Sequence, residues 1–170
     1  MNKLFGDYDS KTATINKVFK EIGIDRDELT QLDHFCYRTE TIAEYRKAVD
    51  EFSDLGRNLG EQMVQKRPIT VIELSEPILS NGWTIDFFEI AAPKPTSFYP
   101  SGLEHAEFVV RRTLASFEQQ HAALPFDKND NVLNPELKYR DKGISVKFHQ
   151  LSLGAVAMIE ARQNETGLAR

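Results

Sequence analysis

The apolar positions at the start of the chain follow helical spacing and then change to strand spacing. Residues 11–30 carry apolar side chains close to every third or fourth position, and Gly23 would divide this stretch into two short helices. The segment DHFCYRTE at residues 33–40 alternates instead, with Phe35 and Tyr37 on one face and polar side chains on the other. The pattern therefore predicts an amino-terminal helical cover followed by a strand.

A helix and three strands are predicted next. Thr41 can cap a helix whose apolar residues recur at helical spacing. Residues 59–74 are rich in β-branched side chains and indicate two strands that meet in a hairpin. A loop is expected around Pro77 and Gly82, and WTIDFFEIA at residues 83–91 is predicted to be the next strand.

The order of strand, helix and strands restarts after a proline-rich linker. Residues 92–102 hold three prolines, which disfavour a helix or a central strand. A strand is predicted at residues 103–110, a helix at 113–124, a polar loop at 125–136 and a closing hairpin near Lys142. The last segment is expected to form a short docked helix.

The predicted fold class is α+β, with a repeated unit and an amino-terminal helical extension. The expected boundaries are a helical cover at 1–31, a first module at 32–91, a linker at 92–102, a second, trimmed module at 103–150, and a carboxy-terminal segment at 151–170.

Two fragments repeat across these modules. The acid-histidine pair at residues 33–34 is matched by another at residues 104–105, each at the head of a strand. The closing strands match as well, since Glu89 and His149 each follow a phenylalanine.

Strand alternation gives the predicted sheet one apolar face and one polar face. Beside Phe87, the polar face collects His34, Cys36, Arg38, Glu89, His105, Glu107, Lys147 and His149. Unpaired polar groups in a dry core cost roughly 1 to 3 kcal/mol each. Water would satisfy these groups on a plain solvated surface, and a divalent cation bound by three imidazoles and one carboxylate would satisfy them better. Such a set suits iron, manganese, cobalt, nickel or zinc and leaves coordination positions open for a substrate.

Composition and net charge limit the partners and the cellular location that the sequence predicts for this protein. The 170 residues are 41% apolar and 28% charged, a mixture that can bury a core. The 21 Lys and Arg against 26 Asp and Glu give a net charge of −5, so nucleic acid is not an expected partner. The start MNKLFGDYDS is not leader-like, no apolar run approaches the roughly 20 residues of a bilayer span, and Cys36 is the single cysteine. A cytoplasmic protein without a membrane partner is expected.

Four stretches of the chain resemble one known family. They are DHFCYR, EQMVQKRPI, FYPSGLEHAEFVV and NPELKYRDKGISVKFHQLS, spread over most of residues 32–153. In them the chain is similar to the YecM-like proteins of the vicinal oxygen chelate superfamily, which includes glyoxalase I, extradiol dioxygenases and bleomycin-resistance proteins. The resemblance implies paired βαβββ modules whose eight-stranded, incompletely closed sheets wrap a concave metal site.

The resemblance also implies a ligand set. Metal ligands in that superfamily sit on the first and last strand of each module, which picks His34, Glu89, His105 and His149. Strand alternation had already placed all four on the polar face. Glyoxalase-like and dioxygenase-like members more often carry a glutamate at the position of His149. His34, His105 and Glu89 resemble the two-histidine, one-carboxylate set of the extradiol enzymes.

The remaining charged side chains of the polar face have two interpretations each. Arg38 and Lys147 could hold an anionic group of a substrate, or they could neutralise Glu107. Glu107 could act as a general base or could orient an imidazole, and Glu89 is the other candidate base.

Two functions follow from these residues. The first is a metal-dependent enzyme, of isomerase, epimerase, lyase or dioxygenase type, in which the cation stabilises an enediolate or enolate of a small substrate. The second is a non-catalytic protein that sequesters a small planar or aromatic ligand, as bleomycin-resistance proteins do. Because edge strands in the superfamily often pair between chains, a homodimer is compatible with either function.

Overall fold

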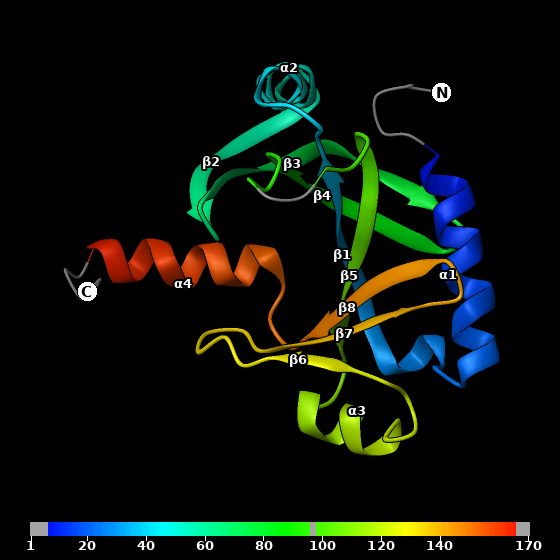
Figure 1. The fold of residues 1–170 in the computed structure, drawn as a ribbon. Coiled ribbons are helices and arrows are strands. Elements are labelled where there is room, and N and C mark those ends of the chain that lie inside the picture. The colour runs from blue at the N-terminus through cyan, green and yellow to red at the C-terminus, as the bar shows by residue number, and fades with distance from the viewer. Residues whose placement is uncertain (1–6, 96–97, 166–170) are drawn as a thin grey trace.

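A computed structural model describes residues 7–95 and 98–165, and it shows one curved sheet with α1 and α4 on opposite sides (Figure 1). The helices are Tyr8–Ile22 (α1), Ile42–Ser53 (α2), Leu114–Gln120 (α3) and Leu153–Glu165 (α4), with a 3₁₀ turn at Arg26–Glu28 (η2). The strands are Leu29–Arg38 (β1), Gly56–Val64 (β2), Arg67–Ser80 (β3), Trp83–Ala91 (β4), Gly102–Val110 (β5), Asp127–Asn129 (β6), Glu136–Asp141 (β7) and Ile144–His149 (β8).

The strand order contains the same unit twice. The sheet runs β2-β3-β4-β1-β5-β8-β7-β6. In the first half β1 pairs in parallel with β4, and in the second half β5 pairs in parallel with β8. Each half thus contains a strand, a helix and three further strands, and the halves join where β1 and β5 pair antiparallel. The predicted α+β class, with paired βαβββ modules and an amino-terminal helix, is confirmed.

Local sequence signals start and end the first two helices. Asp7 accepts a hydrogen bond from the Ser10 N–H at the start of α1, and Gly23 ends that helix in the left-handed conformation with a φ of 77°. Thr41 and Glu44 satisfy each other's backbone N–H groups in a capping box at the start of α2.

The apolar face of the sheet forms the core with these helices. Its aromatic side chains Phe35, Phe88, Phe108 and Phe148 are almost fully buried, as is Trp83. α1 packs against β3 and β8, and α2 packs against β2, β3 and β4. Burial of this face against α1 and α2 fixes the register of each strand, because a slip by one residue would turn the apolar side chains toward the polar face.

Two segments that were predicted to be loops from their proline and polar residues contain strands. β3 continues through the expected loop at Pro77 and ends only at Ser80. A register shift between Glu73 and Ile78 takes the proline out of the regular ladder, which is where a strand tolerates it. The expected polar loop at residues 125–136 contains the short strand β6, which pairs with β7.

Two element boundaries also differ from those predicted. β1 begins at Leu29, so the stretch after Gly23 forms only the turn η2 and not a second helix. α3 ends at Gln120 and does not reach residue 124.

α4 is the predicted carboxy-terminal helix, and its first turn contacts the polar face of the sheet. The Leu153 N–H donates to Asp33 Oδ2 at 2.8 Å, and a Cβ at Gly154 would lie 3.5 Å from the Phe87 ring. Within residues 7–95 and 98–165, no helix combines the length and the apolar character that a bilayer span requires.

Candidate metal centre

Two β-bulges shape the polar face at matching places in the two halves. In β1, Leu32 pairs with Phe108 and His34 pairs with Glu107, so Asp33 is an extra residue in the ladder. In β5, Glu104 is the extra residue, because His105 and Leu103 pair with consecutive residues of β1. A bulge re-aims the side chains around it. Each acid therefore lies beside the histidine that follows it in the chain.

Each acid orients its histidine. His34 Nδ1 lies 3.1 Å from Asp33 Oδ2, and His105 Nδ1 hydrogen-bonds the Glu104 carboxylate. A carboxylate at Nδ1 fixes the ring and leaves Nε2 free to face another partner, which is the usual arrangement around histidine ligands of metals.

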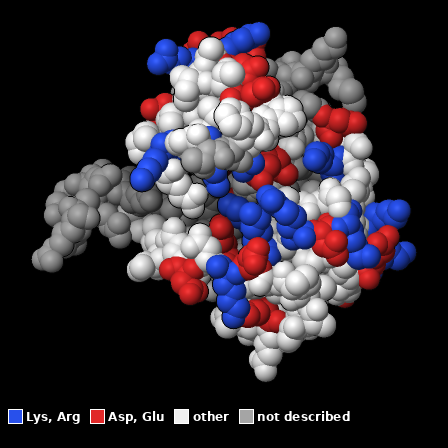
Figure 2. Space-filling model, viewed as in Figure 1, with Lys and Arg blue, Asp and Glu red and all other residues white. Residues whose placement is uncertain are grey.

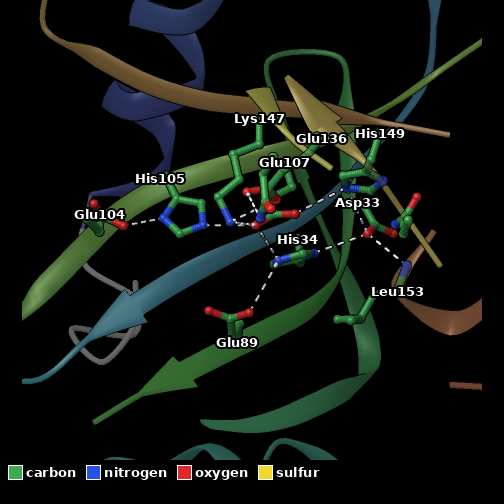
Figure 3. A network of polar contacts seen from close by, with 12 residues as sticks. Asp33, His34, Glu89, Glu104, His105, Glu107, Glu136, Lys147, His149 and Leu153 are labelled. Carbon is green, nitrogen blue, oxygen red and sulfur yellow. Dashed lines mark hydrogen bonds and ion pairs between the residues drawn. The ribbon is translucent and has the colours of Figure 1, made fainter. Parts of the chain in front are cut away.

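The Glu107 carboxylate lies where the three histidines of the face converge (Figure 3). Its Oε1 is 3.5 Å from His34 Nε2 and 2.9 Å from His105 Nε2, and its Oε2 is 3.3 Å from His149 Nε2. Lys147 Nζ donates to Oε1 at 2.7 Å and also lies 3.3 Å from Glu136. Glu107 is therefore the centre of the network.

Two groups of potential metal ligands share Glu89. Cys36, Glu89 and His105 have ligand atoms within 4.8 Å of one another, and so do His34, Glu89 and Glu107. Of the four predicted ligands, the structure thus brings Glu89 close to His34 in one group and to His105 in the other.

His149 lies to one side of both groups. Its Nε2 is 3.7 Å from Asp33 Oδ2, and both of its ring nitrogens are buried without hydrogen-bond partners. His34 Nε2 is likewise buried and without a hydrogen-bond partner. Buried imidazole nitrogens normally have a partner, so these nitrogens are candidates to bind a ligand atom or an ion.

Lys147 occupies in the second half the place that Glu89 occupies in the first. Glu89 lies beside Cys36 in the β1–β4 pair, and Lys147 lies beside Glu107 in the β5–β8 pair. Cys36 and Glu107 each follow the oriented histidine of their strand by two residues. The expected match of Glu89 with His149 is therefore wrong, because the register of β8 shifts it by two residues.

The burial of opposite charges sets the protonation of the network. Burial alone would lower the pKa of His34, but Glu107 and Asp33 raise it well above its usual value. Burial would raise the pKa of Glu107, yet His34 and Lys147 hold it well below its usual value. Glu107 and Asp33 thus favour the protonated form of His34, and a bound cation would take the place of that proton.

Burial and neighbouring charges also set the pKa values of Glu104 and Cys36, at the edge of the network. Against the effect of burial, His105 lowers the pKa of Glu104 to about 2, with help from Arg38 and Arg140. Burial and then Glu89 raise the pKa of the Cys36 thiol well above its usual value. Cys36 is therefore a protonated thiol and a poor ligand in spite of its position.

Arg38 and Lys147, the predicted substrate-binding residues, both have acidic partners. Arg38 Nη2 lies 3.1 Å from Glu104 Oε1, and Lys147 is bound by Glu107 and Glu136. On the face seen in Figure 2, acidic and basic side chains lie next to one another across the middle of the molecule.

Asp33 and Glu104 are functional candidates that were not selected from the sequence. The signal was available, because an acid precedes the histidine in both repeated fragments. What the sequence does not show is the bulge, and without it alternation places each acid on the opposite face from its histidine.

Comparison with known proteins connects this fold to a family. A family model described as YecM protein matches residues 1–127. The chain belongs to the YecM family. Among curated proteins, Protein YecM of Escherichia coli (strain K12) is 25% identical over 166 residues, covering 86% of this chain and 86% of that protein.

Two solved structures share the fold of this YecM family member. One, titled Structural Genomics, Protein EC4020, has a TM-score of 0.77 at 22% identity and covers 92% of this chain and 91% of its own. The hypothetical protein BH1468 from Bacillus halodurans C-125 has a TM-score of 0.52 at 14% identity, over 72% of this chain and 94% of its own. These likenesses concern the fold, and a fold does not fix a function. The function has to be argued from the polar face.

Proposed function

We propose that this YecM family member binds a divalent transition metal on its polar face and activates a small substrate that chelates the ion through two adjacent oxygens. His34 and His105 would supply the imidazoles, and Glu89 and Glu107 the carboxylates. The observation that carries the proposal is the state of His34. Its Nδ1 is held by Asp33, and its buried Nε2 has no hydrogen-bond partner while facing two carboxylates.

The separations around His34 fit Glu89 and Glu107, whereas His105 falls with Glu89 and Cys36 in the other group of donor atoms. His34 Nε2 is 3.5 Å from Glu107 Oε1 and 4.0 Å from Glu89 Oε2. Two atoms bound to one ion at about 2.1 Å lie about 3 to 4 Å apart. His149 lies nearest the other oxygen of Glu107 and nearest Asp33, so we assign it to positioning Glu107 in place of the predicted role as a ligand.

The chemistry of such a site is acid-base chemistry on a polarised substrate. A bound divalent ion would act as a Lewis acid on the substrate oxygens. Glu107 is a weak base, because His34 and Lys147 hold its pKa well below the usual range. Glu89 is the better candidate base, since no lysine or arginine of the described residues forms a salt bridge with it.

One observation favours the alternative, a non-catalytic binding protein on the same scaffold. Lys147 stands where the first half has Glu89, and its ammonium already neutralises Glu107. A face neutralised in this way could hold a small ligand without any ion.

Metal content separates the two proposals. The full chain, purified without an affinity tag and treated with a chelator, would be reconstituted separately with iron(II), manganese, cobalt, nickel and zinc and then desalted. The metal-dependent enzyme predicts close to one ion per chain for at least one of these metals, measured by mass spectrometry of the elements. Negligible retention of all five would contradict it and leave the binding protein.

Asp33 and Glu104 are expected to strengthen metal binding through the histidines that they orient. Asp33→Asn and Glu104→Gln should each weaken zinc binding about 10- to 100-fold, which is the usual cost of losing the carboxylate behind a histidine ligand. Isothermal titration calorimetry would measure the affinity. Asp141→Asn is the matched control, because Asp141 accepts hydrogen bonds from Lys142 and Tyr139 outside the network. Equal affinities for all three variants would show that the two acids have no part in metal binding.

A further inference from the structure

Beyond the histidines, the polar face continues into a small apolar floor and then into a group of cations. Cys36, Ile69 and Ala91 form a separate buried apolar cluster. Arg38 lies beside Ala91 in the β1–β4 pair, and Arg67 lies two residues before Ile69 on the same face of β3. The face therefore leads from Glu89 and His105 across this floor to two arginines.

Arg67 is buried without a carboxylate partner. Its residue is 7% exposed, and its Nη1 donates to the Ala92 carbonyl at 3.1 Å and lies 3.5 Å from the Tyr99 hydroxyl. Its Nε has no hydrogen-bond partner, and no acidic side chain of residues 7–95 and 98–165 forms a salt bridge with it. An unpaired buried charge is strongly unfavourable, so a buried guanidinium of this kind is best explained by an anion that binds it.

Two further cations lie around Arg67. Arg38 covers the Tyr99 ring at 4.1 Å, and its Nε is also buried without a hydrogen-bond partner. The Lys94 N–H donates to the same Tyr99 hydroxyl at 3.0 Å. Burial and then the positive charges of Arg67 and Arg38 lower the pKa of Lys94. Of these three cations, Arg38 is the one that forms a salt bridge with an acid in the described part of the chain, and that acid is Glu104.

We infer that Arg67, with Arg38 and Lys94, binds a carboxylate or phosphate group of the ligand whose chelating oxygens reach the candidate metal centre. The link to the metal rests on the proposed function, whereas anion binding by these residues does not need the ion. Arginine fits this task because its planar fork binds carboxylate and phosphate with two parallel hydrogen bonds. Lys147, the other predicted anion-binding residue, is already bound by Glu107 and Glu136.

The floor between the two ends limits the size of this ligand. Cys36 and Arg38 are two residues apart on an extended strand, a distance of about 6.6 Å. The side chains between the candidate metal centre and the arginines are those of Cys36, Ile69 and Ala91, which form the buried apolar cluster. The substrate class is therefore a small acid, with an anionic group a few bonds away from its chelating oxygens.

The arginine Nε–H signals of the wild-type chain test this inference directly. After chelator treatment, the protein would be titrated with inorganic phosphate and, separately, with acetate, while nitrogen–proton correlation spectra follow Arg67, Arg38 and Arg57. Arg57 is the matched control, because it is exposed and its Nε donates to Glu73 at 2.8 Å. We expect saturable shifts at Arg67 and Arg38 with at least one anion. The anion that saturates these shifts at the lower concentration, phosphate or acetate, identifies the group that the site prefers. No saturable shift at Arg67, or equal shifts at all three arginines, would overturn the inference.

Arg67→Met and Arg57→Met provide a second, independent test. With Arg67 as an anion-binding residue, Arg67→Met should keep or raise Tm in buffer free of phosphate and carboxylates and should lose the rise in Tm that phosphate gives the wild type. Arg57→Met should keep that rise. A purely structural Arg67, tied to Ala92 and Tyr99, would instead give a lower Tm with the phosphate response unchanged. Zinc binding by Arg67→Met should equal that of the wild type, so either proposal can fail while the other stands.

Discussion

Replacing either His34 or His105 with alanine is expected to lower the affinity of the protein for a divalent transition metal by more than about 100-fold. Loss of an orienting acid alone costs about 10- to 100-fold at such sites, and loss of the ligand itself costs more. Both imidazoles are buried on the polar face with Nδ1 held by a neighbouring carboxylate. His149, the third histidine of the face, has no hydrogen-bond partner at Nδ1 and so is not oriented in the same way. Isothermal titration calorimetry with zinc on chelator-treated protein would measure the change.

His121→Ala is the matched control for these two variants. His121 is also buried and also paired with a carboxylate, since its Nε2 lies 2.9 Å from Glu28 Oε2. It lies at the end of α3, away from the polar face of the sheet. His121→Ala should therefore bind zinc as the wild type does. If His34→Ala and His105→Ala bind zinc as tightly as His121→Ala, the proposed ligands are wrong.

Removing the Glu107 carboxylate should have the largest effect on folding. Glu107→Ala leaves the ammonium of Lys147 with Glu136 as its remaining carboxylate partner and removes the carboxylate that lies within 3.5 Å of three histidines. Breaking a buried ion pair by removing one partner costs about 3 to 5 kcal/mol. Because Glu136 remains, we expect a loss of about 3 kcal/mol in the free energy of unfolding. Chemical denaturation of the metal-free protein would measure it.

The double variant shows whether the ion pair causes this loss. Lys147→Met in the Glu107→Ala background removes the stranded charge, so it should restore a large part of the lost stability. Lys147→Met in the wild type should be destabilising, because it leaves Glu107 short of a cation. If the effects of the two single variants simply add, the pair does not act as a unit and Glu107 is not the centre of the network.

Alternation along the strands is enough to predict the polar face. Phe35 and Phe88 point to the core, while His34, Glu89 and His105 point away from it, and this follows from side-chain direction alone. The order of strand and helix could also be predicted from the sequence. Gly23 ends α1 and Thr41 starts α2, and both are residue types that favour these positions.

The parts that were missed depend on pairing between distant strands. Asp33 and Glu104 orient the histidines only because each is the extra residue of a bulge, and a bulge is defined by the partner strand. The match of Lys147 with Glu89 depends in the same way on the register of β8 against β5. Arg67 was not selected from the sequence, because it lies within the hairpin predicted at residues 59–74 and the pattern there gives no sign that the first residue of β3 is buried.

Anomalous diffraction from crystals of the cobalt- or zinc-reconstituted chain tests the central claim most directly. Data collected at the absorption edge of the metal should show one strong peak on the polar face, about 2.1 Å from the Nε2 atoms of both His34 and His105 and in contact with a Glu89 or Glu107 oxygen. The absence of a peak there at full metal loading, or a single strong peak at another place on the protein, would contradict the account.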